Sequence, residues 1–309
     1  MIARALLPVL GSLALLATAC DKGKEEGKDG KEAKADPKAA ADGKEAAGDE
    51  GEAPLAVASG DEGVDGPVPP DTSMVFFQVS GGLIPLACFD KDKKTVAAGE
   101  ACLDMVPADA EVRVSAGDQA FNKKMGERVE PSCMDGSGKL VAISAEGLQG
   151  GAEFDFGTWP PSGLRTVTLV PSDSTSPMNT QLDDDTKAKL QAKVGKGEIS
   201  AHQVAEVDVD GNGKKEDIYS VFVPHPSMAE QYTWSGIFMA RDGNLDDLLL
   251  LTKSESRKDV FEMLGVVDMD GAGDKELWIR MQWEDGSGQA VFQLEGGGVK
   301  ELGKWSCGA

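Results

Sequence analysis

The stretch VAEVDVDGNGKKEDIY, residues 204–219, has a second copy in LGVVDMDGAGDKELW, residues 264–278. The matching residues Asp208 and Asp268 are 60 positions apart. Each copy continues through an apolar strand, a polar connection and a further strand pair around a Gly-containing turn. A fixed period of this kind is typical of stacked supersecondary units, because one unit alone cannot cover its own apolar face. The alignment therefore predicts two structural repeats, at residues 203–252 and 262–305.

The part of the chain before the repeats also has a strand-and-turn pattern. Its short apolar or alternating runs are bounded by Gly, Pro, Asp or Ser, which favours an all-β, mostly antiparallel fold. One short helix is expected near 183–195, because Asp183, Asp184 and Asp185 can cap and complement a helix N-terminus. A cation site at this Asp triplet is the alternative. The expected strands are Met74–Val79, Leu83–Phe89, Ala110–Val114, Lys139–Ser144 and Leu164–Val170.

The first acidic loop, residues 208–216, has oxygen donors at alternate positions. Such spacing around two glycines lets successive oxygens converge on one point, as a hard cation of the size of Ca²⁺ requires. An EF-hand is excluded because Tyr219 stands where the bidentate Glu of its twelfth position belongs. The alternative is an Asp-Gly turn whose carboxylates only cap backbone amides. The predicted ligands are Asp208, Asp210, Asn212, the backbone carbonyl of Lys214, and Glu216.

This loop resembles the Asp-x-Asp-x-Asn/Asp-Gly-x-x-Glu/Asp calcium loops of FG-GAP and VCBS repeats, which join strands of β-propeller blades. The resemblance covers two stretches of the C-terminal half, without the Phe-Gly…Gly-Ala-Pro signature. It implies propeller-like blades of four antiparallel strands in this half. In many relatives such blades serve adhesion or ligand binding on a propeller face.

The second acidic loop, residues 268–276, has a weaker ligand set. Asp268, Asp270 and Glu276 match the first loop, and Asp274 replaces Lys214, but Ala272 stands where the third side-chain oxygen belongs. Losing one ligand from a small set lowers calcium affinity. Calcium is therefore predicted at the first loop and is doubtful at the second.

The N-terminus has the order of a bacterial export signal. Arg4 precedes an apolar run from Ala5 to Leu16, and small residues at 17–19 come directly before Cys20. This resembles the bacterial lipobox, although Ala17 stands where Leu is usual. The resemblance implies that residues 1–19 are a lipoprotein signal peptide and that Cys20 is lipidated with palmitate. The alternative is an ordinary secretory signal cut after Ala19, which leaves Cys20 as a free thiol.

Residues 20–66 are rich in Lys, Glu, Asp, Ala and Gly. Such a segment cannot bury enough apolar surface to offset its ordering entropy, so we expect a disordered charged tether. A charged tail that binds a partner is the alternative. Residues 67–309 are then the β-rich globular domain. The formal net charge of −22 argues against nucleic acid as a partner and suits cations or basic ligands.

Four cysteines remain besides Cys20. An even number in an exported chain favours two disulfides, with three connectivities open. We expect Cys88–Cys102, because a short loop between two apolar segments closes easily, and therefore Cys133–Cys307. A zinc site is the alternative, disfavoured because no Cys-x-x-Cys spacing exists.

Enzyme signatures are absent from the sequence. The chain has two histidines, His202 and His225, and neither has a Glu or a second His at zinc-helix spacing. No nucleophile elbow or phosphate-binding loop of Gly-Lys-Ser/Thr type occurs either. Trp159 could sit exposed and stack on a sugar, while the other tryptophans of the strands are expected in the core: Trp234, Trp278 and Trp283.

The sequence thus predicts a protein that is lipid-anchored in the bacterial cell envelope, on the periplasmic or outer-surface side. We expect a structural calcium loop and a non-catalytic binding or scaffolding role. The expected partners are the membrane, through the anchor, and an unknown envelope protein or glycan. The alternative function is hydrolysis of an envelope or extracellular polymer on a β-propeller frame.

Overall fold

The structure is a computed structural model that describes residues 72–117, 119–130, 142–145, 155–255 and 259–308. The chain divides into two units, residues 1–59 and 60–309, and every described element belongs to the second. Within these residues no helix combines the length and the apolar character needed to cross a membrane. The described strands pair in antiparallel fashion, which confirms the all-β prediction.

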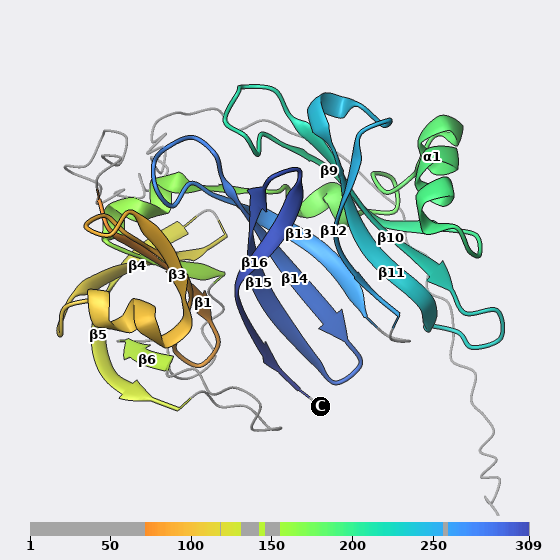
Figure 1. Cartoon of the computed structure of the whole chain (residues 1–309). Coiled ribbons are helices and arrows are strands. Elements are labelled where there is room, and N and C mark those ends of the chain that lie inside the picture. Colours follow the sequence, from red (N-terminus) through yellow and green to blue (C-terminus); the bar gives the residue numbers. More distant parts are fainter. Residues whose placement is uncertain (1–71, 118, 131–141, 146–154, 256–258, 309) are drawn as a thin grey trace, which may run out of the picture. The chain divides into compact units, whose positions relative to one another are not determined.

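The first half of the unit is a closed six-stranded barrel (Figure 1). The strand order is β1-β7-β4-β5-β6-β2, and β1 also pairs with β2, which closes the ring. Strand β3 adds to β2 outside the ring. The strands are β1 (Met74–Val79), β2 (Leu83–Asp90), β3 (Thr95–Ala98), β4 (Glu111–Ala116), β5 (Gln119–Val129), β6 (Ala142–Ala145) and β7 (Phe156–Trp159).

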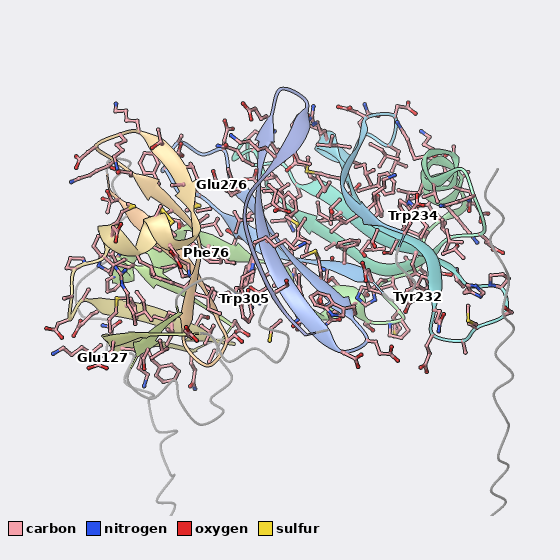
Figure 2. All side chains as sticks on the ribbon, turned by 60° about the horizontal axis from the view of Figure 1, so that its bottom comes forward. Phe76, Glu127, Tyr232, Trp234, Glu276 and Trp305 are labelled. Carbon is pink, nitrogen blue, oxygen red and sulfur yellow. A yellow bond between two sulfur atoms is a disulfide. The ribbon has the colours of Figure 1, made fainter. Side chains whose placement is uncertain are left out.

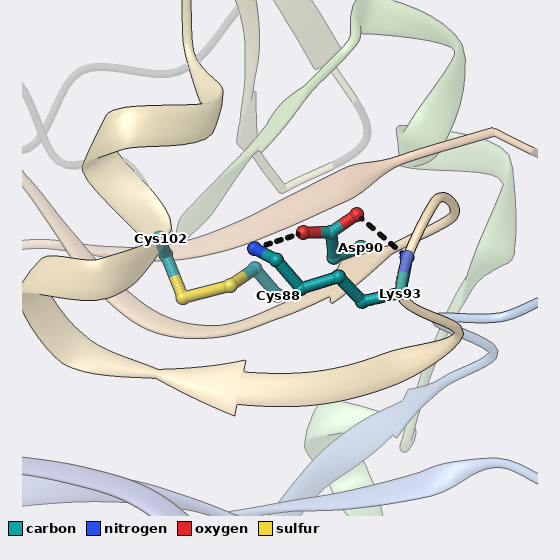
Figure 3. Close-up of a disulfide and its surroundings, with 4 residues drawn as sticks. All are labelled: Cys88, Asp90, Lys93 and Cys102. Atoms are coloured by element: carbon teal, nitrogen blue, oxygen red, sulfur yellow. Dashed lines mark hydrogen bonds and ion pairs between the residues drawn. A yellow bond between two sulfur atoms is a disulfide. The ribbon is translucent and has the colours of Figure 1, made fainter.

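A disulfide closes the β2–β3 region of the barrel. Cys88 in β2 is bonded to Cys102 in the 3-10 helix Gly99–Met105, and both residues are fully buried (Figure 3). In the turn after β2, Asp90 accepts from the ammonium of Lys93 at 2.7 Å and from its backbone N–H at 3.2 Å. The predicted Cys88–Cys102 pair is confirmed. The second predicted disulfide includes Cys133, which lies outside the described residues.

Each repeat forms the same four-stranded antiparallel meander. In both, the acidic loop joins the first strand to the second, and short β8 (Val167–Leu169) extends the second sheet beside β13. The first meander is β9 (Ser200–Val207), β10 (Glu216–Pro224), β11 (Tyr232–Ala240) and β12 (Leu248–Ser254). The second is β13 (Val260–Val267), β14 (Glu276–Trp283), β15 (Gly286–Glu295) and β16 (Gly298–Cys307).

The two meanders pack face to face through one apolar core. Ile218, Ile237, Leu277 and Ile279 are all fully buried there. Two buried polar side chains also bridge the sheets: Gln203 bonds both the N–H and the C=O of Met263, and the Ser220 hydroxyl donates to the carbonyl of Phe261. We call this pair of meanders the sandwich. Satisfied buried polar groups of this kind favour one register between sheets.

Different elements cover the outer faces of the sandwich. Helix α1 (Asp184–Val194) covers the first sheet through Leu190, which packs among apolar side chains of β10 and β11 (Figure 1). The barrel covers the second sheet, where Phe76, labelled in Figure 2, meets Trp278 edge to face with ring centroids 5.1 Å apart. In the described residues the two sheets of the sandwich are therefore flanked by a helix and a barrel.

Helix α1 begins where the Asp triplet predicted. The Asp183 carboxylate accepts from the N–H groups of Asp185 and Thr186, at 3.0 and 2.9 Å. The Thr186 backbone N–H and then its hydroxyl lower the pKa of Asp183. Gly195 ends the helix in the left-handed conformation, with φ of 73°. The triplet thus acts as a helix cap, which the sequence favoured over a cation site.

Several predictions about strands and tryptophans need correction. The strand expected at Leu164–Val170 is only β8, because residues 161–166 form a 3-10 helix. Strand β5 was not expected, since most of its side chains are exposed and its sequence has no apolar alternation. Trp234 and Trp278 are buried as expected, but Trp283 is half-buried. Trp159 packs half-buried against the barrel core rather than standing exposed.

Candidate metal centre

The two acidic loops lie in contact at one end of the sandwich. The Lys275 N–H of the second loop donates to the Val209 carbonyl of the first at 2.9 Å. Gly211 sits so close to Gly273 that a Cβ on Gly211 would collide with the Gly273 carbonyl oxygen. The repeats are therefore joined at their loops as well as through their core.

Glycines and side-chain turns shape the first loop. Gly211 and Gly213 have φ of 68° and 85°, a conformation that other residues adopt only with strain. Between them the Asn212 N–H donates to Asp210 Oδ1 at 3.1 Å, and the Lys214 N–H donates to Asn212 Oδ1 at 2.7 Å. These Asx turns curl the chain back so that Glu216 pairs with Val207 at the start of β10.

The curl brings three carboxylates together. One oxygen each from Asp208, Asp210 and Glu216 lies within 4.8 Å of the others. Asp208 Oδ1 is shielded from solvent and has no hydrogen-bond donor among the described residues. A buried acceptor without a partner costs about 1–3 kcal/mol, and a cation would remove this cost. The triad can therefore hold a metal ion, although its geometry does not identify which one.

Glu216 is the buried member of the triad, with 2% of its surface exposed. Its Oε2 accepts from the Val209 N–H at 2.6 Å, and the Asp242 N–H also bonds to it. Burial raises the pKa of Glu216, and the nearby charges of Asp210 and Asp208 raise it further. A cation among the three carboxylates would offset both effects.

The side chains of the other predicted ligands of the first loop have partners in the loop or at Asp242. Asn212 donates its amide hydrogens to Asp210 at 2.8 Å and to Asp242 at 3.3 Å. The Lys214 ammonium lies 3.5 Å from the Asp242 carboxylate. Lys214 was predicted to bind the cation through its backbone carbonyl, and this role stays a prediction.

Two residues near the triad were not predicted. Lys275 donates to the Asp208 carbonyl at 2.7 Å, and its ammonium is 3.4 Å from Asp208 Oδ2. Asp242, with φ of 51°, reaches the same loop from the β11–β12 connection. Spacing within the repeat could not indicate either residue, because both contacts arise from tertiary packing.

The second loop has the same backbone with a poorer arrangement of oxygens. Asp268 Oδ1 is also buried without a donor in the described part of the chain. Glu276 Oε2 accepts from the Met269 N–H at 3.2 Å, matching Glu216 and Val209. The Asp270 carboxylate accepts from the Ala272 N–H at 2.8 Å, and Asp274 is exposed. No three carboxylates of this loop approach one another as closely as those of the first loop, within the residues described.

Burial raises the pKa of two carboxyl groups in this loop. Glu276, 2% exposed, has its pKa raised to about 8 by burial, and Asp270 and Asp268 add to the rise. Burial also raises the pKa of Asp268. The second loop thus favours a proton on Glu276 where the first gathers a triad suited to a cation.

The predicted signal peptide, Cys20 and the tether lie outside the described residues. Comparisons of the chain with protein-family models, with curated proteins and with solved structures found no match. The function is therefore argued from the residues of this chain alone.

Proposed function

We propose that the first acidic loop binds Ca²⁺ as a structural ion. Asp208, Asp210 and Glu216 would hold it, joined by Asn212 and the carbonyl of Lys214. The observation that carries the proposal is the carboxylate triad within 4.8 Å, with Asp208 Oδ1 buried and unpaired in the described structure. An all-oxygen set rich in carboxylates suits a hard cation, and a flexible loop suits Ca²⁺ better than the strictly octahedral Mg²⁺. The resemblance to FG-GAP and VCBS loops supports the same choice.

Calcium at this position would act on stability rather than on a reaction. It would offset the repulsion between three close carboxylates and fix the loop that carries the Gly211–Gly273 contact between the repeats. We therefore assign the protein a non-catalytic binding or scaffolding role.

The site of action we propose is the bacterial cell envelope, on its periplasmic or outer-surface side, with Cys20 lipidated. Support comes from the export signal and from the Cys88–Cys102 disulfide, a bond that persists in oxidising compartments. The tether would hold the folded domain away from the anchor. An envelope protein or glycan is the partner we propose.

Two experiments test these proposals separately. Thermal unfolding in calcium, magnesium and EGTA should give a higher Tm with calcium than with EGTA, and a smaller rise with magnesium. A Tm indifferent to all three would overturn the calcium proposal. Expression in a bacterium fed labelled palmitate should label the parent and not Cys20→Ser, while an unlabelled parent would overturn the lipid anchor.

A further inference from the structure

A pocket lies at the end of the sandwich away from the acidic loops. The strands that leave the loops run toward it: β10 ends at Pro224, and β14 ends at Trp283. Figure 2 labels Glu276 toward one end of the sheets and Tyr232 toward the other. The pocket has a volume of about 450 Å³, and both repeats line it. Small-molecule sites have volumes of roughly 300 to 1,000 Å³.

Two half-buried aromatic residues line this pocket, one from each repeat. Tyr232 opens β11, and its ring packs on Phe222 with centroids 4.5 Å apart, which limits its movement. Trp283 closes β14. Such rings combine a large apolar face with a polar group at the edge, so they suit a ligand that has both apolar faces and hydroxyls.

The polar groups of the pocket offer both donors and acceptors. Gln231 Oε1 is shielded from solvent and has no donor in the part of the chain that the structure describes. Gln282, exposed at the wall, adds a second amide. Burial lowers the pKa of His202, so its ring is neutral at pH 7 and offers one donor and one acceptor. A hydroxyl also donates and accepts, and it matches each of these groups.

We propose that this pocket binds a neutral saccharide. Tyr232 and Trp283 would pack on the apolar faces of sugar rings, while Gln231, Gln282 and His202 bond to hydroxyls. A hydroxyl donor would satisfy the buried Gln231 oxygen, whose isolation otherwise costs free energy. The exposed carboxylate of Glu230 at the pocket disfavours anionic sugars. The inference rests on the binding role proposed above, to which it gives a ligand class, and is independent of calcium at the other end.

The test is calorimetric titration, in detergent, of the protein as it is processed by the bacterium that expresses it. The probes are the neutral tetrasaccharides of chitin, cellulose, starch and mannan, with tetragalacturonate and putrescine as the anionic and amine controls. We expect saturable binding of at least one neutral tetrasaccharide and none of the controls. Two outcomes overturn the proposal. One is that none of the neutral tetrasaccharides binds, and the other is that putrescine or tetragalacturonate binds more tightly than they do. Calcium stabilisation measured on the same sample shows whether the calcium proposal fails with it.

Matched variants locate the binding. Trp283→Phe and Gln282→Ala should each weaken binding at least tenfold. Trp159→Phe, at a half-buried tryptophan of the barrel, should change it less than twofold. Gln282 is exposed, so its variant is expected to fold. An equal loss in Trp159→Phe, or unchanged binding in Gln282→Ala and Trp283→Phe, would place the sugar elsewhere and overturn the assignment.

Discussion

The first and second acidic loops share a backbone and differ in chemistry. Both turn through two left-handed glycines, and in both a buried Glu accepts from the N–H of the residue directly after the first Asp. Both leave that Asp with one unpaired buried oxygen among the described residues. The first loop has Asn212 where the second has Ala272. Among the described residues, only the first loop brings three carboxylates within 4.8 Å of one another. The same backbone turn thus gathers carboxylates suited to a cation in the first loop and favours a protonated Glu276 in the second.

Lys275 connects the two acidic loops. It extends from the second loop to the carbonyl and carboxylate of Asp208 in the first, and both side chains are less than one-third exposed. Its counterpart Lys215 points to Glu206 at 3.8 Å, on the surface. The two repeats therefore share their backbone structure but differ in the contacts of their charged residues. Variants at the matching positions of the two loops test this difference.

The largest effect we expect is a pH dependence from Glu276. Its pKa is raised to about 8 in the folded protein from 4.5, so folding takes up a proton between these values. Stability from this group is then greatest below pH 4.5 and is lost as pH rises toward 8. In EGTA, Glu276→Gln should remove roughly 3 to 4 kcal/mol of the stability lost between pH 5 and pH 8.

Urea unfolding at each pH measures this effect, with Glu301→Gln, at an exposed carboxylate, as the control. If parent and Glu276→Gln lose equal stability over this range, Glu276 is already ionised in the folded protein and the comparison of the loops is wrong.

The contact between the loops gives the next largest effect. In Gly211→Ala the new Cβ meets the Gly273 carbonyl, so the free energy of unfolding should fall by about 3 kcal/mol or more. In Gly213→Ala no atom lies within 4 Å of the new Cβ. Only the strain of the positive φ then lowers the free energy of unfolding, by about 1 kcal/mol. Denaturant unfolding of the two variants compares them. Equal losses would mean that the loops do not hold each other in place.

Restoring the missing ligand should make the loops alike. Ala272→Asn supplies the second loop with the side-chain oxygen of Asn212, so we expect a new calcium site. At a calcium concentration 100 times its Kd, that site adds about 2.7 kcal/mol of stability. The reciprocal change Asn212→Ala should weaken calcium binding at the first loop. Unchanged calcium stoichiometry in Ala272→Asn would show that more than one oxygen separates the loops.

The smallest expected effect belongs to Lys275. Lys275→Met removes the cation beside Asp208, which should lower stability without calcium by about 1 kcal/mol and tighten calcium binding. Lys215→Met, which loses only a surface ion pair, should change neither. Unfolding in EGTA and calcium titration of both variants measure the difference. Weaker calcium binding in Lys275→Met would show that Lys275 supports the site instead of competing with the cation.

Much of the fold was predictable because local signals agree with tertiary structure. Met74–Val79 is strand β1 within the predicted bounds, and Asp183 and Gly195 cap α1 as their residue types indicate. The 60-residue offset between Asp208 and Asp268 predicted two equivalent meanders. Barrel closure could not be predicted, since besides the local β1–β2 hairpin it depends on the β1–β7 and β2–β6 pairings between segments far apart in the sequence.

The grouping of three carboxylates could be predicted from the sequence, whereas the residues packed around them could not. Alternate spacing identified Asp208, Asp210 and Glu216, because the loop itself brings them together. Burial of Glu276 and the reach of Lys275 depend on how the repeats pack, which spacing does not encode. Trp283 was expected in the core from strand periodicity, but it ends β14 and lines the pocket instead.

Calorimetric titration of the chelator-stripped protein with Ca²⁺ tests the central claim most directly. The account predicts one bound Ca²⁺ per chain, lost in Asp208→Ala and retained in Asp268→Ala. Absence of binding in the parent protein, or equal binding in Asp208→Ala, would contradict it.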